Sequence, residues 1–158
     1  MKNPSAAPTR LEIRYGDLDP YGHVNNAVYL EFFEKIRIDY WKAVADLAGI
    51  RELEAGDVPG ARYVIAETTV RFKAPIVFED TLHGAAWVRT IGNRSYTMDF
   101  ELRTGETFEE GTLAAEGSAA HVFFDPVQDA FQPRPDWFLP TVAKLESRPE
   151  EDFSPEDR

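Results

Sequence analysis

The sequence predicts an α+β domain in which one five-stranded antiparallel sheet wraps around one long central helix. Three observations lead to this fold: a helical period of apolar residues over about 26–48, four later stretches with strand-like alternation, and turn residues between them. Strands joined by hairpin-type connections form an antiparallel sheet, whose apolar face needs a helix to cover it. The 158 residues suffice for one such domain, which we place at residues 9–145.

A short strand and then the long helix open the predicted domain. Apolar and polar residues alternate over 11–16, as in a half-buried strand. Over 26–48 apolar residues recur every three or four positions, and no Gly or Pro interrupts them before Gly49. We therefore expect one helix here, with Asn25 or Asn26 as its N-cap because a carboxamide oxygen can accept a bond from a free amide of the first turn.

Four more strands follow the helix and are expected to form a meander. They are predicted at residues 62–73, 81–91, 95–103 and 112–124. In the first of them, one face is expected to carry Val64, Ala66, Thr68, Val70 and Phe72. A five-stranded sheet with a single long helix leaves apolar surface uncovered, so we expect a homodimer that extends or pairs the sheet.

The two ends of the chain differ in composition from the predicted domain. Residues 1–8 form a polar leader, a short helical stretch is expected around 137–145, and residues 146–158 form an acidic tail that we expect to be disordered.

Composition excludes several classes of function. Lys and Arg number 17 against 28 Asp and Glu, giving a net charge of −11, which opposes binding to nucleic acid. No cysteine is present, so disulfides, thiolate metal sites and a Cys nucleophile are ruled out. No apolar run is long enough to span a bilayer, and we expect a cytoplasmic protein without a membrane partner.

Reactive side chains gather between the first strand and the helix, in the stretch DLDPYGHVNN, residues 17–26. Asp17 and Asp19 at a strand end could be turn residues whose carboxylates bond main-chain amides. His23 could be a structural histidine, or it could bond a carboxylate and tune its charge. The residues alone leave both interpretations open.

A longer pattern around this stretch resembles a known family. The pattern reads R-x-x-D-x-D-x-x-G-H-V-N-N-x-x-Y-x-x-x-F-E, and it is made by Arg14, Asp17, Asp19, Gly22, His23, Val24, Asn25, Asn26, Tyr29, Phe33 and Glu34. It is similar to the signature of the 4-hydroxybenzoyl-CoA thioesterase-like branch of the hotdog-fold acyl-CoA thioesterases. The runs over 70–75 and 92–95 also resemble later segments of that family, so the resemblance covers roughly residues 10–125.

The resemblance implies a hotdog fold and hydrolysis of a fatty or aryl acyl-CoA. Thioester hydrolysis needs a nucleophile or base beside the carbonyl carbon and donors for the developing oxyanion. The family's acting carboxylate corresponds to Asp19, as nucleophile or general base. The amide of Asn26 at the helix start would then be the oxyanion donor, with His23 as an orienting residue.

The resemblance also suggests which residues and partners surround the substrate. Tyr21, Gly22, Asn25 and Tyr29 are expected to contact it. No cofactor and no metal is implied, and an acyl-carrier protein is a possible alternative carrier to CoA. A homodimer or homotetramer is expected, with the acyl pocket at the dimer interface.

Two other functions remain open on the sequence. A hotdog domain could bind acyl-CoA without hydrolysing it, since fold alone does not determine function. A hotdog enoyl-CoA hydratase or dehydratase is the second, although such enzymes resemble a different signature. Assays of thiol release and of enoyl-CoA hydration distinguish the thioesterase, the acyl-CoA-binding module and the hydratase or dehydratase.

Overall fold

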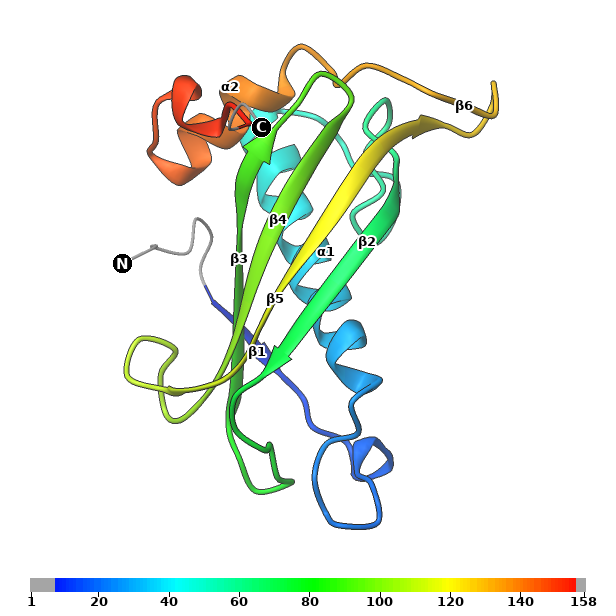
Figure 1. The fold of residues 1–158 in the computed structure, drawn as a ribbon. Coiled ribbons are helices and arrows are strands. Elements are labelled where there is room, and N and C mark those ends of the chain that lie inside the picture. The colour runs from blue at the N-terminus through cyan, green and yellow to red at the C-terminus, as the bar shows by residue number, and fades with distance from the viewer. Residues whose placement is uncertain (1–7, 156–158) are drawn as a thin grey trace.

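A computed structural model describes residues 8–155, and it shows one long helix lying against an antiparallel sheet (Figure 1). The predicted leader, apart from Pro8, lies outside the described residues. The helices are α1 (Val28–Ala48) and α2 (Phe138–Glu146), with 3₁₀ turns at Tyr15–Asp17 and Glu150–Phe153. The strands are β1 (Thr9–Leu11), β2 (Tyr63–Phe72), β3 (Leu82–Ile91), β4 (Ser95–Thr104), β5 (Thr112–Asp125) and β6 (Ala130–Phe131). The predicted α+β fold class is confirmed.

The order of strands in the sheet differs from the predicted meander. The strands lie in the order β1-β3-β4-β5-β2, with β6 added to the end of β5, and all pairs are antiparallel. Only β3, β4 and β5 follow one another as hairpins. The connection over 73–81 is too long for a tight hairpin and contains Pro75, so it carries the chain from the β2 edge to the opposite side of the sheet.

Strand β2 contains a bulge, so the five side chains predicted to share one face of this strand do not all do so. Ile65 pairs with His121, but Glu67 pairs with Ala120, so one residue is inserted between them. Because a one-residue shift moves side chains to the other face, Val64 lies opposite the face that carries Thr68. Alternation in the sequence cannot reveal such an insertion.

Strand β1 shares only Leu11 with the strand predicted over 11–16, because it begins earlier, at Thr9, and a local turn forms at the end of the predicted range. Tyr15 begins a 3₁₀ turn and is 82% exposed. The buried carboxylate of Asp17 accepts bonds from the Arg14 main-chain amide at 2.8 Å and the Arg14 side chain at 3.0 Å. Side-chain bonds of this kind compete with strand pairing.

Helix α1 begins at Val28, two residues after the predicted start. Neither Asn25 nor Asn26 is its N-cap, which is Ala27 without a side-chain bond. Instead Asn25 Oδ1 accepts the Ala27 amide at 3.0 Å, forming a turn just before the helix. At the other end Gly49 adopts φ 69°, the left-handed conformation that ends many helices.

Helix α1 covers the inner face of the sheet and approaches it closely at glycines. A Cβ atom on Gly117 of β5 would overlap the ring of Phe33 and lie 2.7 Å from the Thr69 carbonyl oxygen. Phe33 is 1% exposed and stacks on Phe100 with ring centroids 4.7 Å apart. The absent side chain therefore lets the helix rest directly on the strands.

The C-terminal segment corrects the expectation of a disordered tail for residues 146–155. Glu146 closes α2 and accepts the Val88 main-chain amide at 2.7 Å, next to a bulge in β3. Arg148 donates to the Val88 carbonyl at 2.9 Å and lies over the Phe153 ring, 4.1 Å from its centroid. Phe153 is fully buried, and an aromatic anchor of this kind outweighs the acidic composition that suggested disorder.

Neither helix in the described part of the chain combines the length and the apolar character needed to cross a membrane.

A buried histidine lies far from the predicted site. His121 has no exposed surface and accepts a hydrogen bond from Arg37 Nε at 2.8 Å. Burial, followed by the nearby positive charge of Arg37, lowers the pKa of His121 to about 3. The folded protein therefore holds this imidazole neutral at every pH above that value.

This lowered pKa predicts a loss of stability in acid. Below pH 6.5 the unfolded chain binds a proton at His121 that the folded chain does not, so stability falls as the pH drops towards 3, at about 1.4 kcal/mol per pH unit. Urea unfolding between pH 7 and 4 measures the slope. In His121→Gln the slope should be smaller by that amount, and equal slopes would contradict the assignment.

Candidate functional site

The stretch between β1 and α1 folds into a tight turn held by main-chain bonds. The Asp19 amide donates to the His23 carbonyl at 2.7 Å, and the Gly22 amide donates to the Asp19 carbonyl at 3.0 Å. Gly22 has φ 82°, a conformation that L residues rarely adopt. The Val24 amide donates to the Ile76 carbonyl at 2.8 Å, which fixes the turn against the segment after β2.

The Asp19 carboxylate uses one oxygen to hold this turn. Its Oδ1 accepts the amides of Tyr21 at 2.9 Å and His23 at 3.1 Å. Its Oδ2 accepts no hydrogen bond from residues 8–155. The turn interpretation and the reactive interpretation are therefore compatible, because one oxygen positions the carboxylate while the other is available.

The amides of Asn25 and Asn26 differ in their partners. The Asn25 amide donates to the Asp17 carbonyl at 2.8 Å and is not available to a ligand. The Asn26 amide donates to no acceptor within the described part of the chain, and it lies at the positive end of α1. A free amide at a helix start is a natural donor to an oxyanion.

Four of the seven predicted site residues line one cavity of about 290 Å³. These four are Asp19, His23, Asn26 and Tyr29. Tyr21, Gly22 and Asn25 do not line it, and the Tyr21 side chain is 86% exposed. The cavity thus brings the predicted carboxylate and the predicted amide donor together.

His23 and Tyr29 differ in how firmly they are held. The His23 side chain is exposed, and its ring bonds no group of residues 8–155; only its main-chain amide contacts the Asp19 carboxylate. Tyr29 is 3% exposed, and burial raises the pKa of its phenol, so the hydroxyl is protonated at neutral pH. Tyr29 is the more rigid wall of the cavity.

The sequence did not assign the opposite wall of the cavity to the site. This wall is the end of β2 and the residues after it: Phe72, Lys73, Ala74 and Pro75. Phe72 packs edge-on against Tyr29, with ring centroids 4.8 Å apart, and is 50% exposed. The alternation of the strand predicted over 62–73 suggested that Phe72 is an ordinary strand residue. In Figure 1 the C-terminal end of β2 and the turn before α1 lie at the same end of the molecule.

Other candidate residues lie outside this cavity. Asp17 is buried by its bonds to Arg14, which supports a structural role. Glu34 is exposed on α1 and does not line the cavity. Within residues 8–155 no group of three or more His, Asp or Glu side chains is placed to hold a metal ion.

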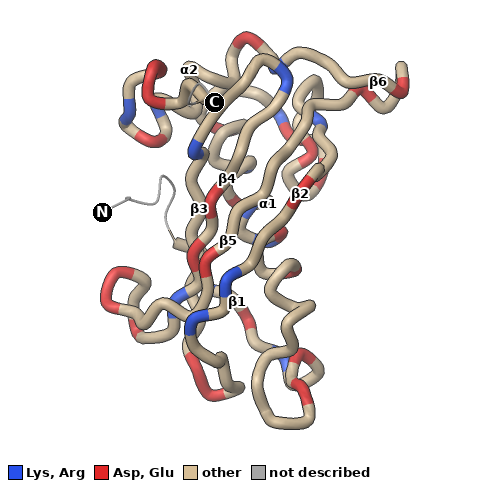
Figure 2. The backbone as a smooth tube through the Cα atoms, in the orientation of Figure 1, with Lys and Arg blue, Asp and Glu red and all other residues tan. Residues whose placement is uncertain are grey.

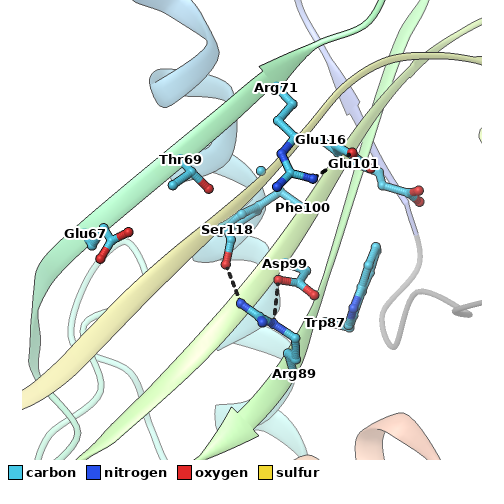
Figure 3. Close-up of a pocket in the computed structure, with 11 residues that line it drawn as sticks. Glu67, Thr69, Arg71, Trp87, Arg89, Asp99, Phe100, Glu101, Glu116 and Ser118 are labelled. Carbon is cyan, nitrogen blue, oxygen red and sulfur yellow. Dashed lines mark hydrogen bonds and ion pairs between the residues drawn. The ribbon is translucent and has the colours of Figure 1, made fainter. Parts of the chain in front are cut away.

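A larger depression, of about 560 Å³, lies on the outer face of the sheet, away from α1 (Figure 3). Its charged side chains are largely paired with one another. Arg89 contacts Asp99 at 3.1 Å and Ser118 at 2.9 Å, and Arg71 lies 3.8 Å from Glu116. Because these groups satisfy each other and no predicted site residue reaches them, we place the candidate site in the smaller cavity.

Charges elsewhere on the chain are mixed in sign. Figure 2 shows Lys and Arg positions interspersed among more numerous Asp and Glu positions. Lys73, on the cavity wall, lies 3.6 Å from Glu116. An anionic ligand in the cavity would thus meet one cation among the lining residues, Lys73.

A long helix packed against one antiparallel sheet in the strand order β1-β3-β4-β5-β2 is the arrangement of the hotdog fold. The family model of the thioesterase-like superfamily matches residues 13–142. The chain belongs to this superfamily, which confirms the fold and the thioesterase class expected from the sequence.

Individual relatives agree with this assignment. The long-chain acyl-CoA thioesterase FadM of Escherichia coli is 28% identical over 117 residues, which cover 74% of this chain and 82% of that protein. A thioesterase from Thermus thermophilus, solved with coenzyme A and Zn, is 27% identical with a TM-score of 0.77, over 94% of this chain and 99% of that chain. A predicted thioesterase from Bacillus stearothermophilus shares the fold, with a TM-score of 0.73, 22% identity and coverage of 90% and 98%.

Proposed function

We propose that this protein hydrolyses acyl-CoA thioesters in the cavity between the turn before α1 and the end of β2. The observation that carries the proposal is the pairing of an available carboxylate oxygen, Asp19 Oδ2, with the unpartnered Asn26 amide in one cavity. The activity named for FadM and the coenzyme A in the Thermus structure support an acyl-CoA substrate.

Two routes of hydrolysis use the same groups. In the first, the Asp19 carboxylate attacks the thioester carbonyl, the C–S bond breaks, and CoA leaves as the thiolate, which takes a proton from water; a second water then hydrolyses the anhydride to the free acid and restores Asp19. In the second, Asp19 takes a proton from water as that water attacks the carbonyl carbon; the C–S bond then breaks, the acid is released, and the proton returns from Asp19 to the departing CoA sulfur. In both, negative charge develops on the carbonyl oxygen, where the Asn26 amide and the helix dipole stabilise it.

The other cavity residues receive supporting roles. Tyr29 and Phe72 would contact the acyl group, because both present aromatic surface to the cavity. Lys73 would meet the CoA phosphates as a charge-assisted donor. His23 is proposed to orient the substrate or the carboxylate through its exposed ring. Tyr21, Gly22 and Asn25, which lie outside the cavity, would contact only the outer part of the substrate.

A second copy of the chain is proposed to complete the site. His23 and Asn26 are exposed and Phe72 is half exposed, so the cavity lacks cover on one side. Ligand sites bury most of a bound acyl group, and a homodimer would supply the missing wall. A cytoplasmic location and delivery from an acyl-carrier protein remain predictions.

Thiol release from a panel of acyl-CoAs tests this function. The panel holds short and long aliphatic chains together with benzoyl and phenylacetyl thioesters, and a thiol-reactive dye reports free CoA. Because the chain has no cysteine, the protein adds no background. We expect turnover of at least one thioester, and the pattern of rates identifies the acyl class.

Two results would replace this function by another. If the protein binds acyl-CoA but releases no thiol from any member of the panel, it is an acyl-CoA-binding module. If it hydrates an enoyl-CoA without releasing thiol, it is a hydratase. Both assays use the full chain.

A further inference from the structure

Tyr29, in the first turn of α1, carries a hydroxyl group that has no hydrogen-bond partner in residues 8–155. The residue is 3% exposed, and the contacts of its side chain are with aromatic rings. Burial raises the pKa of the phenol, so the hydroxyl keeps its proton and is a donor at neutral pH. Because most buried polar side-chain atoms have a partner, a covered hydroxyl without one points to a ligand.

This hydroxyl opens onto the cavity. It is not among the side-chain atoms of residues 8–155 that are both sealed from solvent and without a hydrogen bond. It therefore keeps accessible surface, although the residue as a whole is nearly covered. Since Tyr29 lines the cavity together with Asp19 and Asn26, we place this accessible surface on the cavity side.

Aromatic neighbours from two elements hold the Tyr29 ring in place. Phe72 of β2 packs against it edge-on, with ring centroids 4.8 Å apart, and Phe32 of α1 lies at 6.3 Å on the same pattern. A donor whose position is fixed before the reaction needs no reorganisation when charge develops on the substrate.

The Tyr29 ring lies next to the proposed oxyanion donor. The Tyr29 amide donates to the Asn26 carbonyl at 3.4 Å, so the two residues are one turn apart at the start of α1. Side chains of a helix tilt towards its N-terminus, and each covers the surface over the preceding turn. The Tyr29 side chain therefore covers the surface beside the Asn26 amide.

A thioester carbonyl oxygen has two lone pairs, and the Asn26 amide satisfies one of them. The main-chain amides of the lining residues before it, Asp19, His23 and Val24, all donate within the chain. The His23 ring is exposed, and the Lys73 ammonium lies 3.6 Å from a carboxylate of β5, so neither is a donor held towards the cavity. The phenol hydroxyl is the remaining fixed donor of the cavity wall.

We propose that the Tyr29 hydroxyl donates a second hydrogen bond to the thioester carbonyl oxygen, beside the Asn26 amide. This inference rests on the proposed function and adds a catalytic residue to it. No proton is transferred: the hydrogen bond strengthens as the carbonyl oxygen gains negative charge and weakens again when the C–S bond breaks and the carbonyl re-forms.

Tyr29→Phe tests the hydroxyl while keeping the ring. We expect kcat for thiol release to fall about 10- to 100-fold, the usual range for a lost hydrogen bond to a charged group, while KM stays close to the wild-type value. The carbonyl is common to every thioester, so the factor should be the same for each acyl-CoA of the panel that the wild type hydrolyses. Steady-state thiol release measures it.

Two controls separate this role from a structural one. The melting temperature of Tyr29→Phe should match the wild type within a few degrees, because the lost hydroxyl bonds nothing in the described chain. Tyr63→Phe removes the same atom from a partly buried tyrosine of β2 that does not line the cavity, and it should keep the wild-type kcat.

A second measurement does not depend on turnover. The probe is a ketone analogue of the acyl-CoA that binds most tightly, with a CH₂ group in place of the sulfur and a ¹³C-labelled carbonyl. Hydrogen-bond donors lower the stretching frequency of a carbonyl, so infrared spectra should show a higher frequency for the analogue bound to Tyr29→Phe than for the analogue bound to the wild type.

The outcomes distinguish this inference from the proposed function. A wild type that releases thiol, with kcat in Tyr29→Phe within threefold of it, a loss confined to one acyl class, or an unchanged infrared band, refutes only the role of the hydroxyl. A wild type that releases no thiol while the infrared band shifts in Tyr29→Phe refutes only the hydrolysis. A wild type that neither releases thiol nor binds the analogue refutes both.

Discussion

Asp19→Asn is expected to lower the rate of thiol release by about a hundredfold or more while the protein stays folded. The carboxamide oxygen can still accept the Tyr21 and His23 amides, so the turn before α1 is retained. What is lost is the charge of the carboxylate and the oxygen that we propose acts as nucleophile or base. The measurement is kcat with the best substrate of the acyl-CoA panel.

Two comparisons make this result interpretable. Glu31→Gln removes an exposed carboxylate from the first turn of α1 and should keep the wild-type rate, since Glu31 does not line the cavity. The melting temperatures of both variants should match the wild type within a few degrees. A rate in Asp19→Asn within threefold of wild type would exclude Asp19 from the chemistry.

Phe153→Ala is expected to lower the free energy of unfolding by about 3–5 kcal/mol. The ring is fully buried and lies under the Arg148 guanidinium, so its removal leaves a cavity beneath the C-terminal segment. Urea unfolding followed by circular dichroism measures the change.

Phe131→Ala is the matched control for this substitution. Phe131 lies in β6 and is 60% exposed, so the same change in side chain should cost about 0.5 kcal/mol or less. If both variants lost equally little, residues 146–155 would not be docked on the domain.

Periodicity predicted the elements that cross the core, because each buries one regular face. The repeat over α1 and the alternation over β4 correspond to side chains that contact each other across the core, such as Phe33 and Phe100. The position of β2 at the far edge could not be predicted. Alternation of apolar and polar residues indicates which side chains of a strand face the core, but it does not indicate which other strand pairs with it.

The site was predictable to the extent that the motif is local. Asp19 and Asn26 lie in one short turn, so their proximity follows from the sequence. The difference between the Asn25 and Asn26 amides depends on the position of the Asp17 carbonyl, which the sequence does not give. Phe72 entered the site only through the tertiary packing that brings β2 to the turn.

The tail was misjudged for a related reason. Its acidic composition is typical of disorder, yet Phe153 finds a fully buried position and Glu146 meets a main-chain amide beside the β3 bulge. Neither partner lies nearby in the sequence.

The two walls of the cavity come from separate parts of the chain and can be altered independently. The turn before α1 supplies the carboxylate and a main-chain donor, which no side-chain replacement at Asn26 other than proline would delete. The end of β2 supplies Phe72, which is half exposed and holds no catalytic group. Under the proposed function, acyl preference could therefore be retargeted, by evolution or by a mutant library, through substitutions on β2 that leave Asp19 and the Asn26 amide unchanged.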